Sequence, residues 1–218
     1  SHDDGLTWSL VTTPVNVTST DVCYGDGDFY MNQYIDGGTV GGILKSTDKG
    51  NTWVYTQLPT TVRSTIAITY GNGVLYVISQ YVGDSFRSLN KGSTWSVMST
   101  INVGANYLDV EYGNGVTVIA TRSNNHLYSY DDGLTWNLSR SVTAIVPYKC
   151  VYGNGVFTLI NLYGGTIQVS GSPFNNLIPE KPVLELTAST LTGFYFSYAS
   201  LPVTAIPLNT ILYELNNT

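Results

Sequence analysis

The feature that most constrains this chain is an eight-residue motif, Ser-x-(Asp/Asn)-x-Gly-x-Thr-Trp, which occurs four times. The copies span residues 1–8, 46–53, 88–95 and 129–136, and their tryptophans are 45, 42 and 41 residues apart. A second motif, Tyr-Gly-(Asp/Asn)-Gly, keeps the same interval at residues 24–27, 70–73, 112–115 and 152–155. The chain is therefore built from one unit of about 40 residues, used repeatedly.

The repeat over residues 110–138 indicates what one unit folds into. An apolar stretch ends at Tyr112, Gly-Asn-Gly turns the chain, and residues 116–120 run back. Asn-Gly is the preferred pair where both turn residues need a positive φ, so we expect a tight hairpin. A third strand at 127–130 enters the eight-residue motif, and a fourth leaves it at 136–138. Four short strands in a repeat of this length are typical of a β-propeller blade.

The second strands of the hairpins support this prediction. Residues 74–78 and 156–160 are apolar at nearly every position rather than alternating. Such runs suit strands that are covered on both faces, as in blades stacked around an axis.

The ends of the chain determine the expected number of blades. Full repeats are predicted over residues 20–58, 64–99, 106–139 and 145–178. The remaining segment, 184–215, offers three strands, at 184–187, 194–198 and 211–214, and residues 6–12 offer one more. Pairing the N-terminal strand at 7–11 with 211–214 would complete a fifth blade without leaving an unpaired edge. The sequence thus predicts one all-β domain over residues 1–218, a five-bladed β-propeller of four-stranded antiparallel blades.

Composition excludes several classes of function. A net charge of −6 and a pI near 4.6 argue against binding a nucleic-acid backbone, which needs clustered Lys and Arg. No apolar segment approaches the ~20 residues that span a bilayer, so we expect no membrane insertion, and no signal peptide is visible. Because the chain begins with Ser1 rather than Met, we expect a processed product or a piece of a longer protein.

The two cysteines are expected to be free. Cys23 and Cys150 lie in first strands of repeats that are not neighbours, and their positions relative to the hairpin tyrosines differ by one residue. Adjacent strand positions face opposite sides of a sheet, so a disulfide is disfavoured and buried thiols are predicted.

The eight-residue motif resembles the Asp-box, or bacterial neuraminidase repeat, of sialidases and related propellers. In that family the box joins the third and fourth strands at the rim, away from the ligand face. The resemblance therefore implies structural aspartates, with a calcium or catalytic role for Asp3, Asp48 or Asp131 as the minor alternative. Locally, the carboxylate can accept backbone N–H groups across the turn, Gly50 supplies a left-handed conformation, and Trp53 packs between blades.

The residues that two kinds of enzyme require can be compared with those in the sequence. Sialidase chemistry, as the resemblance implies, needs three converging arginines, and the four in this chain occupy unlike positions in their repeats. A paired-carboxylate glycosidase could use Asp21, Asp109 and Glu111, which lie on first strands lining the central channel. We expect these acids to be solvated or paired with cations instead. His2 and His126 are too isolated to indicate a metal site or a triad, so no cofactor, metal or catalytic residue is predicted.

The connections between second and third strands carry the candidate ligand-binding residues. Ten or eleven residues after each hairpin tyrosine stands an aromatic or cationic residue, accompanied by amides. Aromatic rings that stack on sugars beside amides that bind hydroxyls are typical of carbohydrate sites, and binding residues concentrate on loops of rigid scaffolds. An equally weighted alternative is that the tyrosines only cap the blade ends. The predicted ligand-binding residues are Tyr34, Tyr81, Arg122, Tyr163, Gln33, Gln80, Asn124 and Asn161.

Together, the Tyr-Gly-Asn-Gly hairpins and the eight-residue motifs over residues 1–170 resemble repeats of bacteriophage tail-fibre and receptor-binding proteins. The resemblance implies a non-enzymatic adhesion domain, on a virion surface or extracellular, that recognises a cell-surface glycan or polysaccharide. It also implies membership of a larger oligomeric fibre or spike. A glycan-degrading enzyme and a secreted lectin of non-viral origin stay open as alternatives, as does a purely structural spacer.

Overall fold

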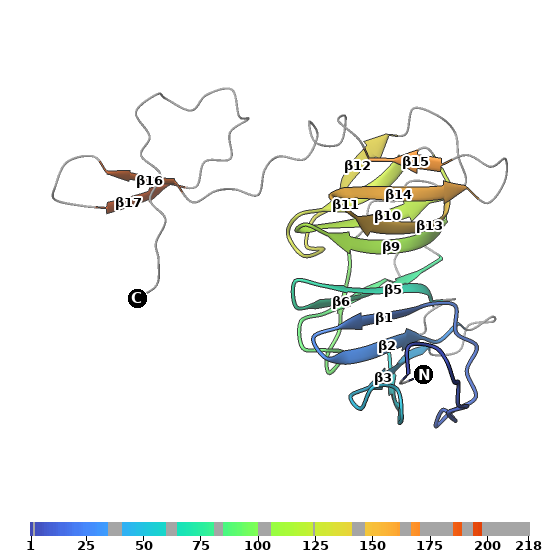
Figure 1. The fold of residues 1–218 in the computed structure, drawn as a ribbon. Coiled ribbons are helices and arrows are strands. Elements are labelled where there is room, and N and C mark those ends of the chain that lie inside the picture. The colour runs from blue at the N-terminus through green and yellow to red at the C-terminus, as the bar shows by residue number, and fades with distance from the viewer. Residues whose placement is uncertain are drawn as a thin grey trace. The chain divides into compact units, whose positions relative to one another are not determined.

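The computed structural model describes residues 1, 3–34, 41–59, 65–80, 85–99, 106–123, 125–140, 147–161, 167–170, 185–188 and 194–197 (Figure 1). The chain divides into two compact units, residues 1–169 and 170–218. The first unit holds all the repeats of the two motifs. The second contributes one hairpin, β16 (Glu185–Ala188) paired antiparallel with β17 (Phe194–Ser197).

The first unit consists of antiparallel sheets whose strands follow chain order, one sheet per repeat. The first repeat forms β1 (Val22–Gly25), β2 (Asp28–Asn32), β3 (Gly42–Ser46) and β4 (Val54–Gln57). The second forms β5 (Thr65–Gly71), β6 (Val74–Ser79), β7 (Phe86–Ser88) and β8 (Ser96–Val97). The third forms β9 (Tyr107–Gly113), β10 (Val116–Thr121), β11 (Asn125–Ser129) and β12 (Asn137–Arg140). The fourth forms β13 (Pro147–Gly153), β14 (Val156–Asn161) and β15 (Ile167–Val169). The prediction of four strands per repeat is confirmed for the first three repeats; in the fourth, the predicted last strand lies outside the described residues.

The hairpins form as the Asn-Gly pairs predict. Asn72 and Gly73 have φ values of 51° and 79°, and Asn114 and Gly115 have 49° and 80°. The flanking strands pair directly across the turn, with Gly71 opposite Val74. Both central residues are left-handed, as a two-residue hairpin of this type requires.

The eight-residue motifs, called Asp turns below, are held by their own side chains. Asp48 accepts hydrogen bonds from the Thr52 backbone N–H (2.8 Å) and from the Thr52 hydroxyl (2.6 Å). The Ser46 hydroxyl donates to Asp48 (2.9 Å) and accepts from the Gly50 N–H (2.8 Å). These bonds, led by the one from the Thr52 hydroxyl, hold the pKa of Asp48 below its usual value. The predicted local role of the aspartate is confirmed.

The sheets stack so that β1, β5, β9 and β13 are successive neighbours (Figure 1). The second strand β6 is buried at every position, as predicted for residues 74–78, and β10 is buried at every position as well. The same prediction for residues 156–160 is wrong: β14 is only partly buried, because the described residues place no sheet on its outer side. Trp136 is buried, in agreement with its predicted core role, whereas Trp53 is only half-buried.

A glycine-on-ring contact joins each pair of neighbouring sheets. In the first three Tyr-Gly-(Asp/Asn)-Gly hairpins, the second residue lies against the tyrosine of the next repeat. A Cβ atom added at Gly25, Gly71 or Gly113 would overlap the ring of Tyr70, Tyr112 or Tyr152, respectively. Glycine is required there because the two hairpins approach too closely for any side chain.

The N-terminal segment differs from its prediction. The sequence predicts a strand over residues 7–11, and the structure has none: Trp8 is 81% exposed and Leu10 fully exposed. The preceding Asp turn is nevertheless complete, with Thr7 donating to Asp3 from both its N–H and its hydroxyl. No described strand pairs with this segment. Its predicted partner, 211–214, lies outside the described residues, so the closed ring and the fifth blade stay predictions.

Two further predictions concern cysteines and membranes. Cys23 and Cys150 are both free, as predicted; Cys150 is buried, whereas Cys23 is only half-buried. Burial raises the pKa of both thiols well above its usual value. The part of the chain that the structure describes contains no helix long and apolar enough to cross a membrane.

Candidate functional site

The predicted ligand-binding residues lie where second strands end, and five of the eight are described. Gln33 and Tyr34 follow β2, Gln80 follows β6, Arg122 follows β10, and Asn161 ends β14. Arg122 is exposed and the other four are half-buried. These positions are equivalent in their repeats, so the residues lie at the same end of each sheet. Tyr81, Asn124 and Tyr163 lie outside the described residues.

The backbone at these positions is fixed from both sides. The Tyr34 N–H donates to the Thr18 carbonyl at 2.7 Å, and the Arg122 N–H donates to the Asn106 carbonyl at 2.7 Å. The Gln80 carbonyl accepts from the Tyr107 N–H at 3.1 Å. At these three positions the loop begins at a residue whose backbone is hydrogen-bonded to another segment. That segment is the one that leads into the same sheet or into the next sheet.

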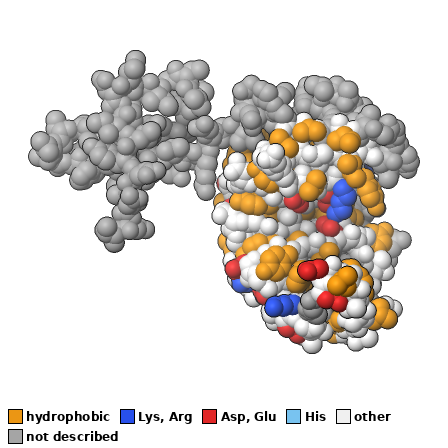
Figure 2. Space-filling view, in the orientation of Figure 1, with side chains coloured by type: hydrophobic (Ala, Val, Ile, Leu, Met, Phe, Trp, Pro, Cys, Tyr) orange, Lys and Arg blue, Asp and Glu red, His pale blue; other side chains and the backbone are white. Residues whose placement is uncertain are grey.

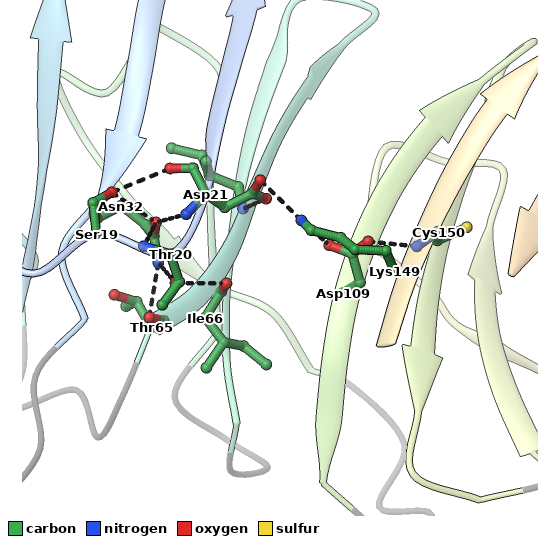
Figure 3. Close-up of polar contacts among 10 residues, drawn as sticks. Ser19, Thr20, Asp21, Asn32, Thr65, Ile66, Asp109, Lys149 and Cys150 are labelled. Atoms are coloured by element: carbon green, nitrogen blue, oxygen red, sulfur yellow. Dashed lines mark hydrogen bonds and ion pairs between the residues drawn. The ribbon is translucent and has the colours of Figure 1, made fainter. Parts of the chain in front are cut away.

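Asn32 is a structural residue rather than part of a ligand-binding surface. Its side chain is fully buried and accepts from the Asp21 N–H (2.8 Å) while donating to the Thr65 carbonyl (2.8 Å) and the Thr20 hydroxyl (2.8 Å) (Figure 3). It thus ties the first repeat to the second. The sequence pattern groups Asn32 with the polar neighbours of Tyr34, but its position inside β2 turns it toward the next sheet.

A second cluster of functional groups lies where the first strands face one another. Lys149 on β13 extends toward Asp21, just before β1, and toward Asp109 on β9 (Figure 3). Its Nζ lies 2.9 Å from Asp21 Oδ1 and 3.1 Å from Asp109 Oδ1. One cation therefore joins carboxylates of the first and third repeats from its place in the fourth. The expectation that these acids pair with a cation is confirmed.

The second oxygen of each of these carboxylates is also occupied. Asp21 Oδ2 accepts from the Ile68 N–H (3.1 Å), and Asp109 Oδ2 accepts from the Cys150 N–H (2.6 Å). Both donors stand two residues before a hairpin tyrosine, so the two bonds are equivalent contacts between neighbouring repeats. Glu111 makes a weaker contact of the same kind, accepting from the Tyr152 N–H at 3.4 Å.

Burial changes the acidity of this cluster. Desolvation raises the pKa of Asp109 to about 6, although Lys149 opposes the shift. Desolvation likewise raises the pKa of Glu111 to about 7, with the neighbouring acids adding to it. Carboxyl groups that hold protons near neutral pH can act as general acids, so the cluster has one property that a glycosidase needs.

Lys149 is the residue of this cluster that sequence reasoning passes over. It occupies the repeat position that Asp21 and Asp109 hold in their own repeats, three residues before the tyrosine. A cation at a position that is acidic in other repeats is the signal that could reveal the pairing. Among the described residues there is no group of three or more His, Cys, Asp and Glu side chains placed to hold a metal ion.

Neither a protein-family description nor a curated protein matches the sequence. Among solved structures, the chain is similar to YCF48 bound to D1 peptide, with 14% identity and a TM-score of 0.58 over 74% of this chain and 54% of that one. It is also similar to the GH74 xyloglucanase from Xanthomonas campestris, with 16% identity and a TM-score of 0.54 over 69% and 29%. The computationally designed Ika4 protein gives 11% identity and 0.55 over 75% and 98%.

YCF48 and the GH74 enzymes are β-propeller proteins, so these likenesses show a propeller repeat fold. The chain spans about half the length of YCF48 and less than a third of the xyloglucanase. At these identities the likeness concerns the fold alone. The resemblances to the Asp-box and to phage tail fibres stay predictions.

Proposed function

We propose that this chain is a non-enzymatic recognition domain that binds a glycan on a host cell surface, as part of a viral attachment protein. It would act on a virion surface or extracellularly. The proposal rests on the residues at which the connections between second and third strands begin. These residues are mostly polar, and in the first three repeats their backbone is hydrogen-bonded to another segment. Where the backbone of a loop is already fixed, less conformational entropy is lost when its side chains bind a ligand.

Each connection contributes a different side chain to one end of the unit. Tyr34 can stack on a sugar ring, and Gln33, Gln80 and Asn161 can exchange hydrogen bonds with hydroxyls. Arg122, which is exposed at the equivalent position of the third repeat, would favour an acidic sugar. Shallow sites of this kind bind weakly one at a time, so presentation in several copies would raise the overall affinity.

The central carboxylates support a binding role over hydrolysis. A glycosidase needs two carboxyl groups that face the scissile bond, about 5 to 10 Å apart, with free oxygens. In this chain Asp21 and Asp109 each use one oxygen for Lys149 and the other for a backbone N–H. A substrate would have to displace these internal partners.

A glycan-degrading enzyme is the second candidate, favoured by the raised pKa of Glu111, about 7. The likeness to a GH74 xyloglucanase agrees with a polysaccharide ligand in either case, and the likeness to a peptide-bound YCF48 makes a peptide ligand worth testing.

The deciding experiment presents immobilised protein to a glycan array and, separately, incubates it with host surface polysaccharide. Retention of the polysaccharide without shortened products supports recognition. Shortened products that disappear in Glu111→Gln would establish the enzyme instead, and the absence of both binding and cleavage would leave a structural spacer.

Single substitutions then test the location of the site. Tyr34→Ala and Arg122→Ala should each weaken binding, the former by about 1–3 kcal/mol if stacking on sugars resembles that on other planar ligands. Tyr128→Ala is the matched control, because Tyr128 is also half-buried but lies on β11 next to an Asp turn. If Tyr34→Ala lowers the melting temperature and leaves binding intact, the tyrosine is a blade cap and the site lies elsewhere.

A further inference from the structure

The glycine-on-ring series has two unmatched ends. Gly25, Gly71 and Gly113 each receive the tyrosine of the following repeat, but nothing lies within 4 Å of a Cβ atom added at Gly153. At the other end of the series, Tyr24 has no preceding repeat and is 61% exposed. The first unit therefore carries one free ring and one free glycine of the same contact.

The face around Tyr24 is apolar and uncovered. Val22, two residues before Tyr24, is 57% exposed. The residues at the equivalent position in the other repeats are Ile68, Val110 and Cys150, which are 2%, 1% and 6% exposed. Each of those residues is buried in a repeat that follows another. Among the described residues, no sheet covers the first repeat on that side, so Val22 is exposed.

The outer face of the fourth repeat is uncovered in the same way. Ile160 on β14 is 43% exposed, whereas its equivalents Ile78 and Ala120 are fully buried. Val151, Ile167 and Val169 are 58%, 63% and 56% exposed. By the strand register, Ile167 and Val169 lie on the same face as Ile160. Figure 2 shows apolar side chains reaching the surface in separate patches on the face that it draws. Contiguous apolar patches on a protein surface mark interaction sites.

The described residues of the fourth repeat form no fourth strand, and its predicted last strand lies outside them. β13–β15 is the one sheet of the described first unit without a fourth strand, and β15 is its open edge. Residues 7–11 follow a complete Asp turn and are unpaired. In the other repeats the residue before the turn's serine pairs with the residue after its tryptophan, as in Lys45–Val54 and Tyr128–Asn137. The same rule would pair Val169 with Ser9.

We propose that a second copy of this chain docks head to tail on the first, with its first repeat against the fourth repeat. Tyr24 of one copy would then lie over Gly153 of the other, and residues 7–11 would supply the fourth strand beside β15. The occupant is a second copy because it carries the same ring, the same apolar face and a segment that could supply a fourth strand. Residues 171–218 contain no further copy of the Tyr-Gly-(Asp/Asn)-Gly motif.

The first and fourth repeats also carry polar residues that could form the contacts seen between neighbouring repeats. Hairpin tips contact the Asp turn of the next repeat, as in the Asp26–Lys91 ion pair (2.5 Å) and the Asn72–Asp132 hydrogen bond (2.9 Å). The corresponding residues at the free ends are Asn154 and Lys49, which are both exposed. In the docked pair the Lys49 ammonium would donate to the Asn154 side-chain oxygen, a contact of the kind already formed within the chain.

The first test measures molar mass by light scattering over a range of concentrations. Wild-type protein should reach at least twice the chain mass of 23.7 kDa. Gly153→Phe should stay at the monomer mass with an unchanged circular dichroism spectrum, because the site is open in the single chain. Leu89→Ala, at an exposed apolar residue of the third Asp turn, is the control and should associate normally. A wild-type monomer, or association that survives Gly153→Phe, overturns the proposal.

The second test identifies which chain supplies the strand. Ser9→Cys and Val169→Cys proteins are prepared separately, mixed and oxidised, so a disulfide between these positions can form only between two chains. The expected product is a mixed dimer, absent when either variant is oxidised alone. If the double variant instead forms the disulfide within one chain and mixing yields none, the chain closes on itself. That result, or protection of β15 by residues 171–218, overturns docking of a second copy.

Discussion

Replacing Gly71 by alanine tests the glycine-on-ring contact, because Gly153 provides a matched position without the ring. Both glycines follow the hairpin tyrosine, and neither has a left-handed φ, so alanine is conformationally allowed at both. At Gly71 the new Cβ overlaps the Tyr112 ring, and at Gly153 it meets nothing. The same substitution should therefore have opposite effects on the free energy of unfolding.

The magnitude follows from the contact. Displacing the ring adds overpacking strain of about 1–3 kcal/mol. It also exposes roughly half of a tyrosine side chain, about 80 Å², which at about 25 cal/mol per Å² costs a further ~2 kcal/mol. Gly71→Ala should thus lose about 3–5 kcal/mol, and its melting temperature should fall by roughly 6–20 °C. Gly153→Ala should gain about 0.5 kcal/mol from the reduced entropy of the unfolded chain.

The assay is thermal and urea unfolding followed by tryptophan fluorescence, at concentrations low enough that every variant is monomeric. Comparing the two glycines cancels the intrinsic effect of replacing glycine by alanine in a strand. If both variants unfold within about 0.5 kcal/mol of each other, the rings do not hold the sheets together and the reasoning fails.

Three further predictions concern the polar contacts. Asn32→Ala should lower the free energy of unfolding by about 2–4 kcal/mol, because the Asp21 N–H and the Thr65 carbonyl lose buried partners; urea titration measures this, and a loss below 1 kcal/mol would contradict it. Asp131→Ala should cost about 1 kcal/mol by losing its bond from the Thr135 N–H, whereas Asp131→Asn should cost much less, since Asn90 already holds an equivalent turn; equal losses in thermal unfolding would count against this account. Because the folded-state pKa of Glu111 is about 7 and the model-compound value is 4.5, the unfolded chain releases this proton first, so stability should fall as pH rises from about 4.5 to 7. Glu111→Gln should remove on the order of 1–2 kcal/mol of that fall, after allowance for solvent screening, and identical pH profiles of the two proteins would refute the assignment.

Local structure could be predicted from the sequence because it depends on local residues. The Asn-Gly pairs fix the hairpins, and Asp48 and Gly50 fix their turn through bonds that span only four residues. The candidate site was less accessible. The placement of Lys149 between Asp21 and Asp109 depends on how the first strands converge, which periodicity alone does not specify.

The ends of the repeat series illustrate the same limit. Residues 7–11 have the composition of a strand, but a strand forms only where a partner edge is available. The sequence pattern pairs them with 211–214, while the open edge of β15 and the free Gly153 point to another chain. Periodicity identifies a blade; the pairing of its edges is a tertiary or quaternary property.

The glycine-on-ring contact also bears on how such a chain can change length. The second and third repeats each have a tyrosine ring that contacts the preceding repeat and a hairpin glycine that receives the ring of the following repeat. A duplicated repeat would therefore be able to form the same contacts with its neighbours. Gain or loss of a whole repeat by recombination would then require no compensating substitutions at the new junction. A cut within a repeat would separate a tyrosine from the glycine that follows it or a turn from its last strand. Selection should therefore tolerate variation in units of about 40 residues and reject intermediate lengths.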